Sequence, residues 1–150
     1  MSTLPEVSPS DQLTGRKPTA KKRIFLSYDY ANDRNYRNLL LAWNKDKDLD
    51  FSFYDMPVDV SVDSNDAAAI KRVICARLAG SSHFLCLVGK LTHNSRWVTW
   101  EIGEALELKR RIVAVKIEND NTSPWALISG GARWALSFNF DAIKKAVDEA

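Results

Sequence analysis

The sequence predicts an α/β domain in which helices cover both faces of a parallel sheet of five strands. Two observations predict this class. Short, nearly continuous apolar runs recur along the chain, as expected for strands that are buried on both faces. Segments with apolar residues at helical spacing separate these runs, and this alternation produces right-handed crossovers and a parallel sheet. With 150 residues, the chain is long enough for one domain and too short for two ordinary ones.

The first strand and helix are expected to follow a polar tail. Residues 1–21 are rich in Ser, Thr and Pro without periodicity, so we expect a disordered tail there and a folded domain over residues 22–150. The apolar run 24–28 is predicted to form the first strand. Asp33 is the expected N-cap of the following helix. The inward face of that helix is expected to contain Tyr36, Leu39, Leu40 and Trp43.

The second strand and helix are joined by an acidic loop. Residues 51–54 are predicted to form the strand, and a polar loop extends from Asp55 to about Asn65. The helix after it is expected to begin near Ser64 or Asp66 and to end at Gly80. Its apolar face is predicted to consist of Ala69, Ile70, Val73, Ile74 and Leu78.

The remaining elements complete the predicted sheet. Residues 83–88 form an apolar third strand that Gly89 ends. Ser95 is the expected N-cap of a helix that extends to about Lys109. After it we expect strands over 112–117 and, more weakly, 134–138, and a helix over 140–149 with Ile143 and Val147 inward.

The ligand site of such a sheet lies beyond the carboxyl ends of its strands, where loops meet helix starts. The loops after Ser27, Tyr54 and Val88 are therefore expected to form a site. Familiar phosphate-binding and phosphoacceptor motifs are absent from these loops. The third strand has no aspartate at its end, the loop 28–33 carries carboxylates that would repel phosphate, and neither GxGxxG nor GK[ST] occurs.

Composition excludes several other classes. The net charge of +2 is too small to indicate nucleic-acid binding, and no run approaches the ~18 apolar residues of a membrane span. No signal peptide is recognisable, so a cytoplasmic protein without a membrane partner is expected. Cys75 and Cys86 are expected to be buried, reduced thiols, with a redox or catalytic role as the alternative. His83 and His93 lack convergent ligands, so no metal site is expected.

The segment 94–106 contains the strongest candidate for chemistry. On a helix, Val98, Ile102 and Leu106 share one apolar stripe, and Glu101 lies at its edge with Trp97 one turn earlier. A carboxylate at such an edge, beside the loop after the third strand, can be partly desolvated in a cleft. The alternative interpretation of Glu101 is an ordinary acid that the helix dipole favours at the start of a helix. The alternative for Trp97 and Trp100 is a packing role.

Several segments together resemble a known family. Residues 22–28, 53–55 and 70–89 resemble the first three strands and the intervening helix of TIR domains, a flavodoxin-like fold. Residues 95–102 are similar to the segment that carries the glutamate of NAD-cleaving TIR domains. The closest resemblance, over about residues 22–140, is to the TIR-like proteins of the Thoeris antiphage system.

The resemblance implies an enzyme that consumes NAD as its substrate, needs no further cofactor, and makes an ADP-ribose-derived signal as a glycohydrolase or cyclase. It implies Glu101 as the catalytic residue, and Ser27, Tyr28, Asp55 and Trp97 as substrate-binding residues. It also implies a homo-oligomer on activation and a separate effector protein that responds to the product.

The loop from Asp55 to Asn65 departs from the family pattern, because it lacks the usual glycine and contains Asp55, Asp59 and Asp63, with Asp66 just beyond it. An acidic loop disfavours a pyrophosphate group unless the carboxylates turn away. Two alternatives to an enzyme stay open, because one fold can serve several functions. One is a non-enzymatic TIR-like interaction module, and the other is a nucleotide-binding sensor without turnover.

Overall fold

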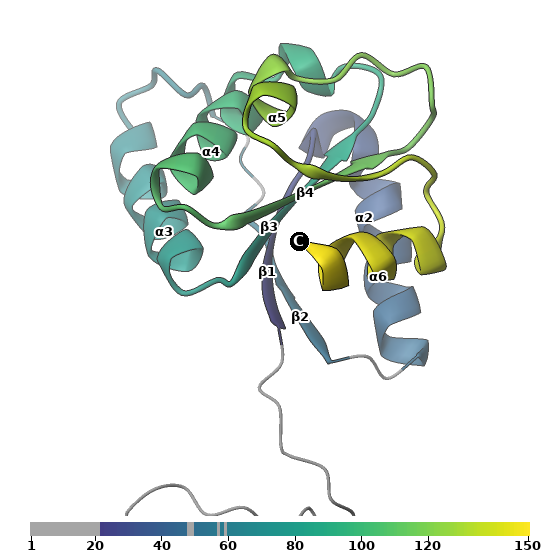
Figure 1. Ribbon diagram of the computed structural model, residues 1–150. Coiled ribbons are helices and arrows are strands. Elements are labelled where there is room, and N and C mark those ends of the chain that lie inside the picture. The colour runs from purple at the N-terminus through teal and green to yellow at the C-terminus, as the bar shows by residue number, and fades with distance from the viewer. Residues whose placement is uncertain (1–21, 48–49, 57, 59) are drawn as a thin grey trace, which may run out of the picture.

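A computed structural model describes residues 22–47, 50–56, 58 and 60–150 (Figure 1). The predicted tail over residues 1–21 lies outside the described residues. The strands are β1 (Lys22–Ser27), β2 (Phe51–Tyr54), β3 (His83–Val88), β4 (Arg111–Lys116) and β5 (Arg133–Ala135). The helices are α2 (Tyr30–Asp46), α3 (Ala67–Ala79), the 3₁₀ turn η1 (Thr92–Asn94), α4 (Arg96–Glu107), α5 (Trp125–Ser129) and α6 (Phe140–Glu149).

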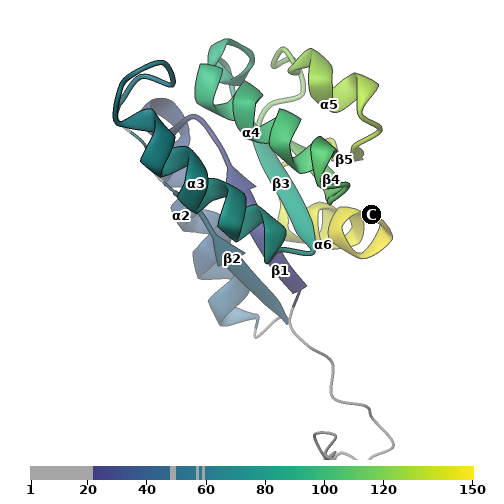
Figure 2. The ribbon, with the colours of Figure 1, turned by 90° about the vertical axis from the view of Figure 1, so that its left-hand side faces the viewer.

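All strand pairs are parallel, and the strand order is β2-β1-β3-β4-β5. The sheet is covered on both faces, with α3, α4 and α5 on one side and α2 and α6 on the other (Figures 1 and 2). The predicted fold class is therefore confirmed. The chain leaves β1 toward β2 and returns to β3 on the other side of β1, so the carboxyl ends of β1 and β3 form the switch point where ligands bind in such sheets.

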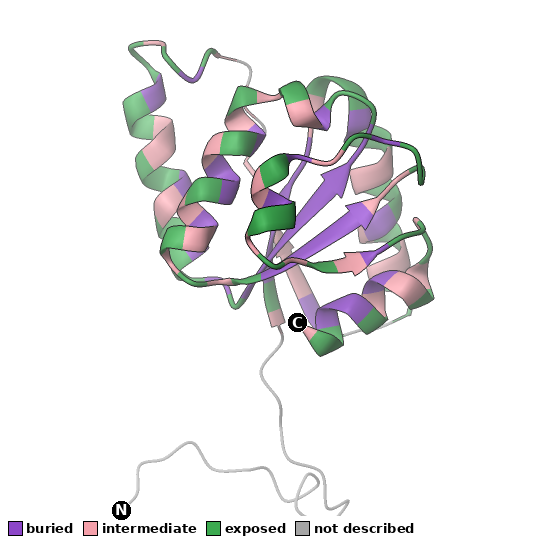
Figure 3. Cartoon of the chain, turned by 45° about the horizontal axis from the view of Figure 1, so that its top comes forward, coloured by how far each residue is buried: buried purple, intermediate pink, exposed green. Residues whose placement is uncertain are grey.

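The central strands are buried on both faces (Figure 3), and successive residues enter different cores. On β1, Ile24 and Leu26 face the α2 and α6 side, whereas Phe25 faces the α3 and α4 side. On β3, Leu85 and Leu87 join the first core, and Phe84 and Cys86 join the second. This alternation explains why the strands are uninterrupted apolar runs in the sequence.

The start of α2 differs from the prediction. The helix begins at Tyr30 with Asp29 at the N-cap, and the predicted N-cap Asp33 lies within the first turns, 6% exposed. The physical reason is that the backbone amides of Asn32 and Asp33 already donate to the carbonyl oxygen of Asp29, so the turn forms earlier. Asp33 is thereby placed under the end of β3.

Three predicted inward residues are exposed. Leu39 is 42% exposed and Val73 40% exposed, so these positions of the predicted stripes are wrong, and Ala69 is exposed as well. The helices α2 and α3 each bury a narrower stripe, centred on Leu40 and Ile74, because each packs on the sheet along one line of residues only.

Element ends and short elements account for the other differences. The helix α4 ends two residues before the predicted Lys109, which has a positive φ of 58° that ends helical geometry. The strand β5 is shorter than 134–138, because pairing with β4 stops at Ala135. Neither η1 nor α5 was predicted from the sequence. Cys86 is buried as expected, whereas Cys75 is partly exposed on the flank of α3 that faces α4.

Candidate active site

The Glu101 side chain is held in place by the start of α4. The Ser95 hydroxyl oxygen accepts a hydrogen bond from the Val98 backbone amide at 3.2 Å and caps the helix, as predicted. This fixes the rotation of α4, so that Val98 and Ile102 are buried in the core. Glu101 lies between them in sequence, is only 5% exposed, and faces the carboxyl end of β1.

Ser27, the last residue of β1, holds the Glu101 carboxyl group. Its hydroxyl donates to Glu101 Oε1 at 2.7 Å, and Ser27 itself is 1% exposed. Burial raises the pKa of Glu101 from 4.5 to about 8, and the negative charge of Asp55 adds to this, while the hydrogen bond from Ser27 opposes it. Glu101 is therefore a buried carboxyl group at the start of α4 and not a solvated one.

A hollow of about 120 Å³ lies above Glu101, and aromatic side chains line it. Tyr28 and Tyr30 line it from the loop after β1, with ring centroids 6.3 Å apart. Trp97 lines it from α4, and Met56 from the loop after β2. The hollow thus combines a buried carboxyl group with largely aromatic and aliphatic walls, beside which Asp29 and Ser95 are the other polar lining residues. This combination suits a flat or ring-shaped group carrying hydroxyls.

Trp97 also holds the loop that precedes α3. Its Nε1 donates to the Val60 carbonyl oxygen at 2.6 Å, and its ring packs edge-on against Trp100 at 5.8 Å. Trp97 and Trp100 therefore pack against each other, as the alternative interpretation stated. The side of Trp97 that lines the hollow remains available to a ligand.

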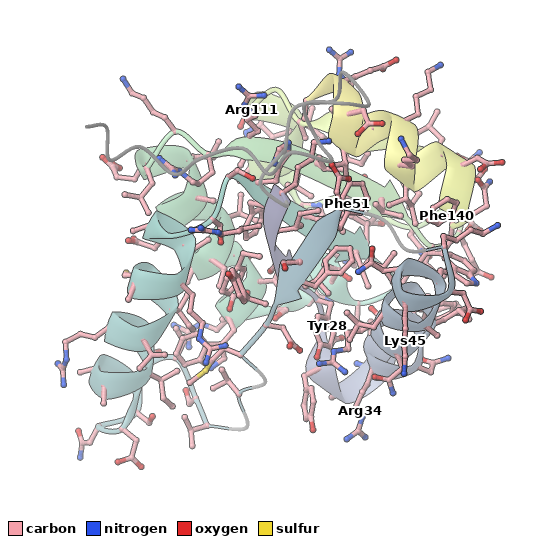
Figure 4. The ribbon with its side chains drawn as sticks, turned by 90° about the horizontal axis from the view of Figure 1, so that it is seen from below. Tyr28, Arg34, Lys45, Phe51, Arg111 and Phe140 are labelled. Atoms are coloured by element: carbon pink, nitrogen blue, oxygen red, sulfur yellow. The ribbon has the colours of Figure 1, made fainter. Side chains whose placement is uncertain are left out.

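A second network ties the loop after β2 to the rest of the site. The Tyr28 hydroxyl donates to Asp55 Oδ2 at 2.7 Å, and Arg37 donates to both carboxylate oxygens, Nε to Oδ2 at 3.1 Å and Nη2 to Oδ1 at 3.0 Å. Burial and the Asp55 carboxylate raise the pKa of the Tyr28 hydroxyl. In Figure 4, Tyr28 lies beside α2, the helix that supplies Arg37.

The acidity of the loop after β2 is partly neutralised. Asp55 is paired with Arg37, and Asp63 forms an exposed ion pair with Arg96 at 2.5 Å. Asp59 lies outside the described residues. The carboxylates of Asp55 and Asp63 are therefore engaged by arginines rather than left as isolated negative charges.

The predicted site residues divide into two groups. Glu101, Tyr28 and Trp97 line the hollow. Ser27 and Asp55 lie behind it and contact Glu101 and Tyr28 respectively. The loops after Ser27 and Tyr54 meet the start of α4 at this hollow, as expected for these two loops. The loop after Val88, which was expected at the same site, lines a different hollow.

Sequence reasoning did not identify Arg37, Tyr30 or Met56. Arg37 is a polar residue in the middle of a helix and carries no local signal, because its partner Asp55 is 18 residues away. Tyr30 could have been found, since it follows the first strand in the loop where a ligand was expected.

The described residues contain no group of three or more His, Cys, Asp or Glu side chains placed to hold a metal ion. Within the same residues, no helix combines the length and apolar character that a membrane crossing requires.

Comparison with known proteins gives one family and several similar folds. The family model described as the TIR-like domain of the Thoeris protein ThsB matches residues 25–122. No curated protein sequence matches the chain. The structure of a 2-deoxyribosyltransferase from Bacillus psychrosaccharolyticus is 12% identical, with a TM-score of 0.56 over 78% of this chain and 88% of the other.

Two further structures are similar. A CMP N-glycosidase from Clostridium botulinum, BcmB, is 14% identical, with a TM-score of 0.55 over 85% of this chain and 99% of the other. The TIR domains of the activated Roq1 resistosome are 16% identical, with a TM-score of 0.49. That alignment covers 64% of this chain and 57% of the Roq1 chain, so the match spans little more than half of the latter.

Proposed function

Because the chain belongs to the family of Thoeris ThsB TIR-like domains, we propose that it consumes NAD as a glycohydrolase or cyclase and makes an ADP-ribose-derived signal in antiphage defence. The observation that carries this proposal is the Glu101 carboxyl group, which is buried under an aromatic-walled hollow and held by Ser27. A separate effector protein responds to the product in this proposal.

The proposed reaction breaks the bond between ribose C1′ and the ring nitrogen of nicotinamide. The bonding electrons leave with nicotinamide, whose ring was cationic, so it departs as a neutral molecule and needs no general acid. The ribose becomes oxocarbenium-like. In hydrolysis, C1′ then bonds to the oxygen of water, which loses a proton. In cyclisation, C1′ bonds to a nucleophilic atom of the same ADP-ribosyl group.

Glu101 is proposed to act as a carboxylate on the ribose. It accepts hydrogen bonds from the sugar hydroxyls and stabilises the positive charge that develops at C1′. Its burial strengthens this interaction, because the effective dielectric constant around it is low. The cationic nicotinamide ring favours the ionised form of Glu101 once the substrate is bound.

The other residues have supporting roles in this proposal. Tyr28, Tyr30 and Trp97 offer aromatic surfaces to the nicotinamide or ribose ring. We assign Ser27 and Asp55 to positioning Glu101 and Tyr28, since their hydrogen bonds are made to these two side chains.

The size of the hollow limits what it holds. About 120 Å³ is below the ~300–1,000 Å³ of sites that enclose a drug-sized ligand. The nicotinamide riboside part is therefore expected to enter the hollow, and the rest of NAD to lie outside it. A homo-oligomer formed on activation would cover that outer part. The CMP N-glycosidase of similar fold is named for cleavage of an N-glycosidic bond, the type of bond that the proposal concerns.

The second candidate function is a non-enzymatic interaction module. The observation that favours it is an apolar face on α5, where Trp125 is 72% exposed and Ile128 50% exposed. These residues are three positions apart and share one side of the helix. Exposed apolar residues grouped in this way are typical of contact surfaces between proteins.

The test is release of nicotinamide from NAD by the full chain, assayed at several protein concentrations. Wild-type protein is expected to release nicotinamide, and Glu101→Gln is expected to abolish this release. Glu104→Gln is the matched control, because Glu104 lies on the same helix, is only partly buried, and does not line the hollow. Equal turnover by Glu101→Gln would contradict the role of Glu101. Defined oligomers without turnover would favour the interaction module.

A further inference from the structure

A second hollow, of about 450 Å³, lies at the carboxyl edge of the sheet and contacts the same helix start as the first. The Glu101 hollow contacts residues 29–31, whereas the second contacts Asn32 and Asp33 on the next part of α2. Tyr36 of α2 also lines it, and the remaining walls come from the loops after β3 and β4. The hollow is lined, among others, by Asp33, Tyr36, Leu91, Ile117 and Asn121.

Asp33 is a buried carboxyl group that accepts few hydrogen bonds from the protein. It is 6% exposed, and a Cβ atom on Gly89 would overlap its carboxylate, so only glycine lets it lie against the end of β3. The Thr92 hydroxyl is 3.4 Å from Asp33 Oδ2 and 3.3 Å from the Leu87 carbonyl oxygen, so one proton serves two acceptors. Among the described residues, none donates to Asp33 Oδ1.

Asn121, in the loop after β4, provides a second buried acceptor at the hollow. It is 6% exposed, and its amide nitrogen donates to the Val88 carbonyl oxygen at 2.9 Å. That bond fixes the side chain, and within the described part of the chain no donor reaches its amide oxygen. A ligand in this hollow therefore meets acceptors that need hydrogen-bond donors.

Part of the lining is apolar, beside the charged residues Lys90 and Glu118. Leu91 is 48% exposed although it lines the hollow, and Ile117 is partly buried. The Tyr36 ring is held edge-on by Phe138, with ring centroids 5.3 Å apart. Leu91 and Tyr36 can cover a flat apolar ring, and its burial would remove the exposed leucine from water.

From these observations we propose that the Asp33 hollow binds a nucleoside group, with Asp33 accepting hydrogen bonds from the ribose hydroxyls and the base lying against Tyr36 and Leu91. A vicinal diol presents two donors to one carboxylate, and a carboxylate at this edge of a parallel sheet binds ribose hydroxyls in other nucleotide-binding folds. The volume of about 450 Å³ is within the range of small-molecule sites. This proposal does not depend on a reaction at Glu101.

The test uses the full chain, titrated calorimetrically with adenosine and with 2′,3′-dideoxyadenosine. Adenosine is expected to bind, and the dideoxy compound to bind at least about tenfold more weakly, because hydrogen bonds to a charged group are lost. Asp33→Asn is expected to weaken adenosine binding by a similar factor. Asp141→Asn is the matched control in the first turn of α6, where the side chain does not line the hollow, and it should bind adenosine as the wild type does.

Two further measurements locate the site. The Gly89 amide, which donates to Thr92 beside Asp33, should shift in NMR spectra when adenosine is added. Leu91→Asp changes an exposed wall residue without touching the core, so it should fold and lose adenosine binding even if Asp33→Asn does not fold.

The proposal is overturned by three results. These are no adenosine binding in the millimolar range, equal binding of the dideoxy compound, and binding that Glu101→Gln weakens while Leu91→Asp leaves it unchanged. The last result would place adenosine in the Glu101 hollow, and it would leave the proposed NAD reaction standing.

Discussion

Glu101 is the residue on which the proposed chemistry depends, and its burial predicts a pH dependence. Its pKa in the free protein is raised to about 8, so at neutral pH most of the carboxyl groups are protonated. If the carboxylate is the active form, kcat/KM for NAD should rise with pH and level off above about pH 8. The profile of kcat should level off at lower pH, because the cationic substrate favours ionisation. A kcat/KM profile that is flat from pH 5 to 9 would contradict this role.

The Ser27 hydroxyl is predicted to tune Glu101 rather than to touch the substrate. Its hydrogen bond stabilises the carboxylate and lowers the pKa of Glu101, so Ser27→Ala should move the kcat/KM profile to higher pH. At neutral pH, Ser27→Ala should lower kcat/KM by about tenfold or more. The control is Thr99→Ala, which removes a hydroxyl on the exposed side of α4, the helix that carries Glu101. A loss of activity without a displaced pH profile would rule out the tuning role.

For single residues, the sequence allowed one strong prediction, Glu101. It named Ser27 and Asp55 only as substrate-binding residues, without the bonds that they make. The spacing of apolar residues along α4 placed Glu101 at the edge of the core, and the structure buries it there. The bonds from Ser27 to Glu101 and from Arg37 to Asp55 join residues 74 and 18 positions apart. Such pairs depend on tertiary packing, which periodicity does not describe.

The loop after β2 is held to α2 by one part-buried ion pair. Arg37 and Asp55 have side chains that are 28% and 12% exposed, and the pair is bidentate. Removing one partner leaves the other charge partly buried, so the single changes Arg37→Ala and Asp55→Ala should each destabilise the fold. A double-mutant cycle measured by urea unfolding should give a coupling energy of about 1–3 kcal/mol. A coupling energy near zero would show that the loop is held by other contacts.

Long elements followed from the sequence, and short ones did not. The strands β1 and β3 contain continuous apolar runs. β3 ends at Val88 as predicted, and β1 ends at Ser27, one residue before the predicted end. The helix α5 has only five residues, too few for a helical period to be recognised. Asp33 was misplaced because aspartate favours helix N-caps in general, while Asp29 takes that position here.

The arrangement of the whole molecule could be predicted because strand and helix alternate along nearly the whole folded part. That alternation gives a parallel sheet with two covered faces, and the order β2-β1-β3-β4-β5 then locates the ligand edge. The division of this edge into two hollows could not be predicted. It depends on the exact start of α2, which contributes to both.

The free energy of unfolding should also depend on pH because Glu101 is buried. The pKa of this group is raised from 4.5 to about 8 on folding, so its stabilising contribution is complete below pH 4.5 and is lost as the pH rises to about 8. Glu101→Gln is neutral at every pH. The free energy of unfolding of this variant, relative to wild type, should therefore be higher at pH 8 than at pH 5, by on the order of a few kcal/mol. An equal difference at both pH values, measured by urea unfolding, would indicate a solvated carboxylate.

The most direct measurement is the pKa of Glu101 in the intact protein, obtained from the ¹³C carboxyl resonance that disappears in Glu101→Gln. We predict a value of about 8 in the free protein and a lower value when nicotinamide riboside is added, because a cation then lies near the carboxylate. A value near 4.5 that does not respond to nicotinamide riboside would contradict a buried carboxyl group at a substrate hollow.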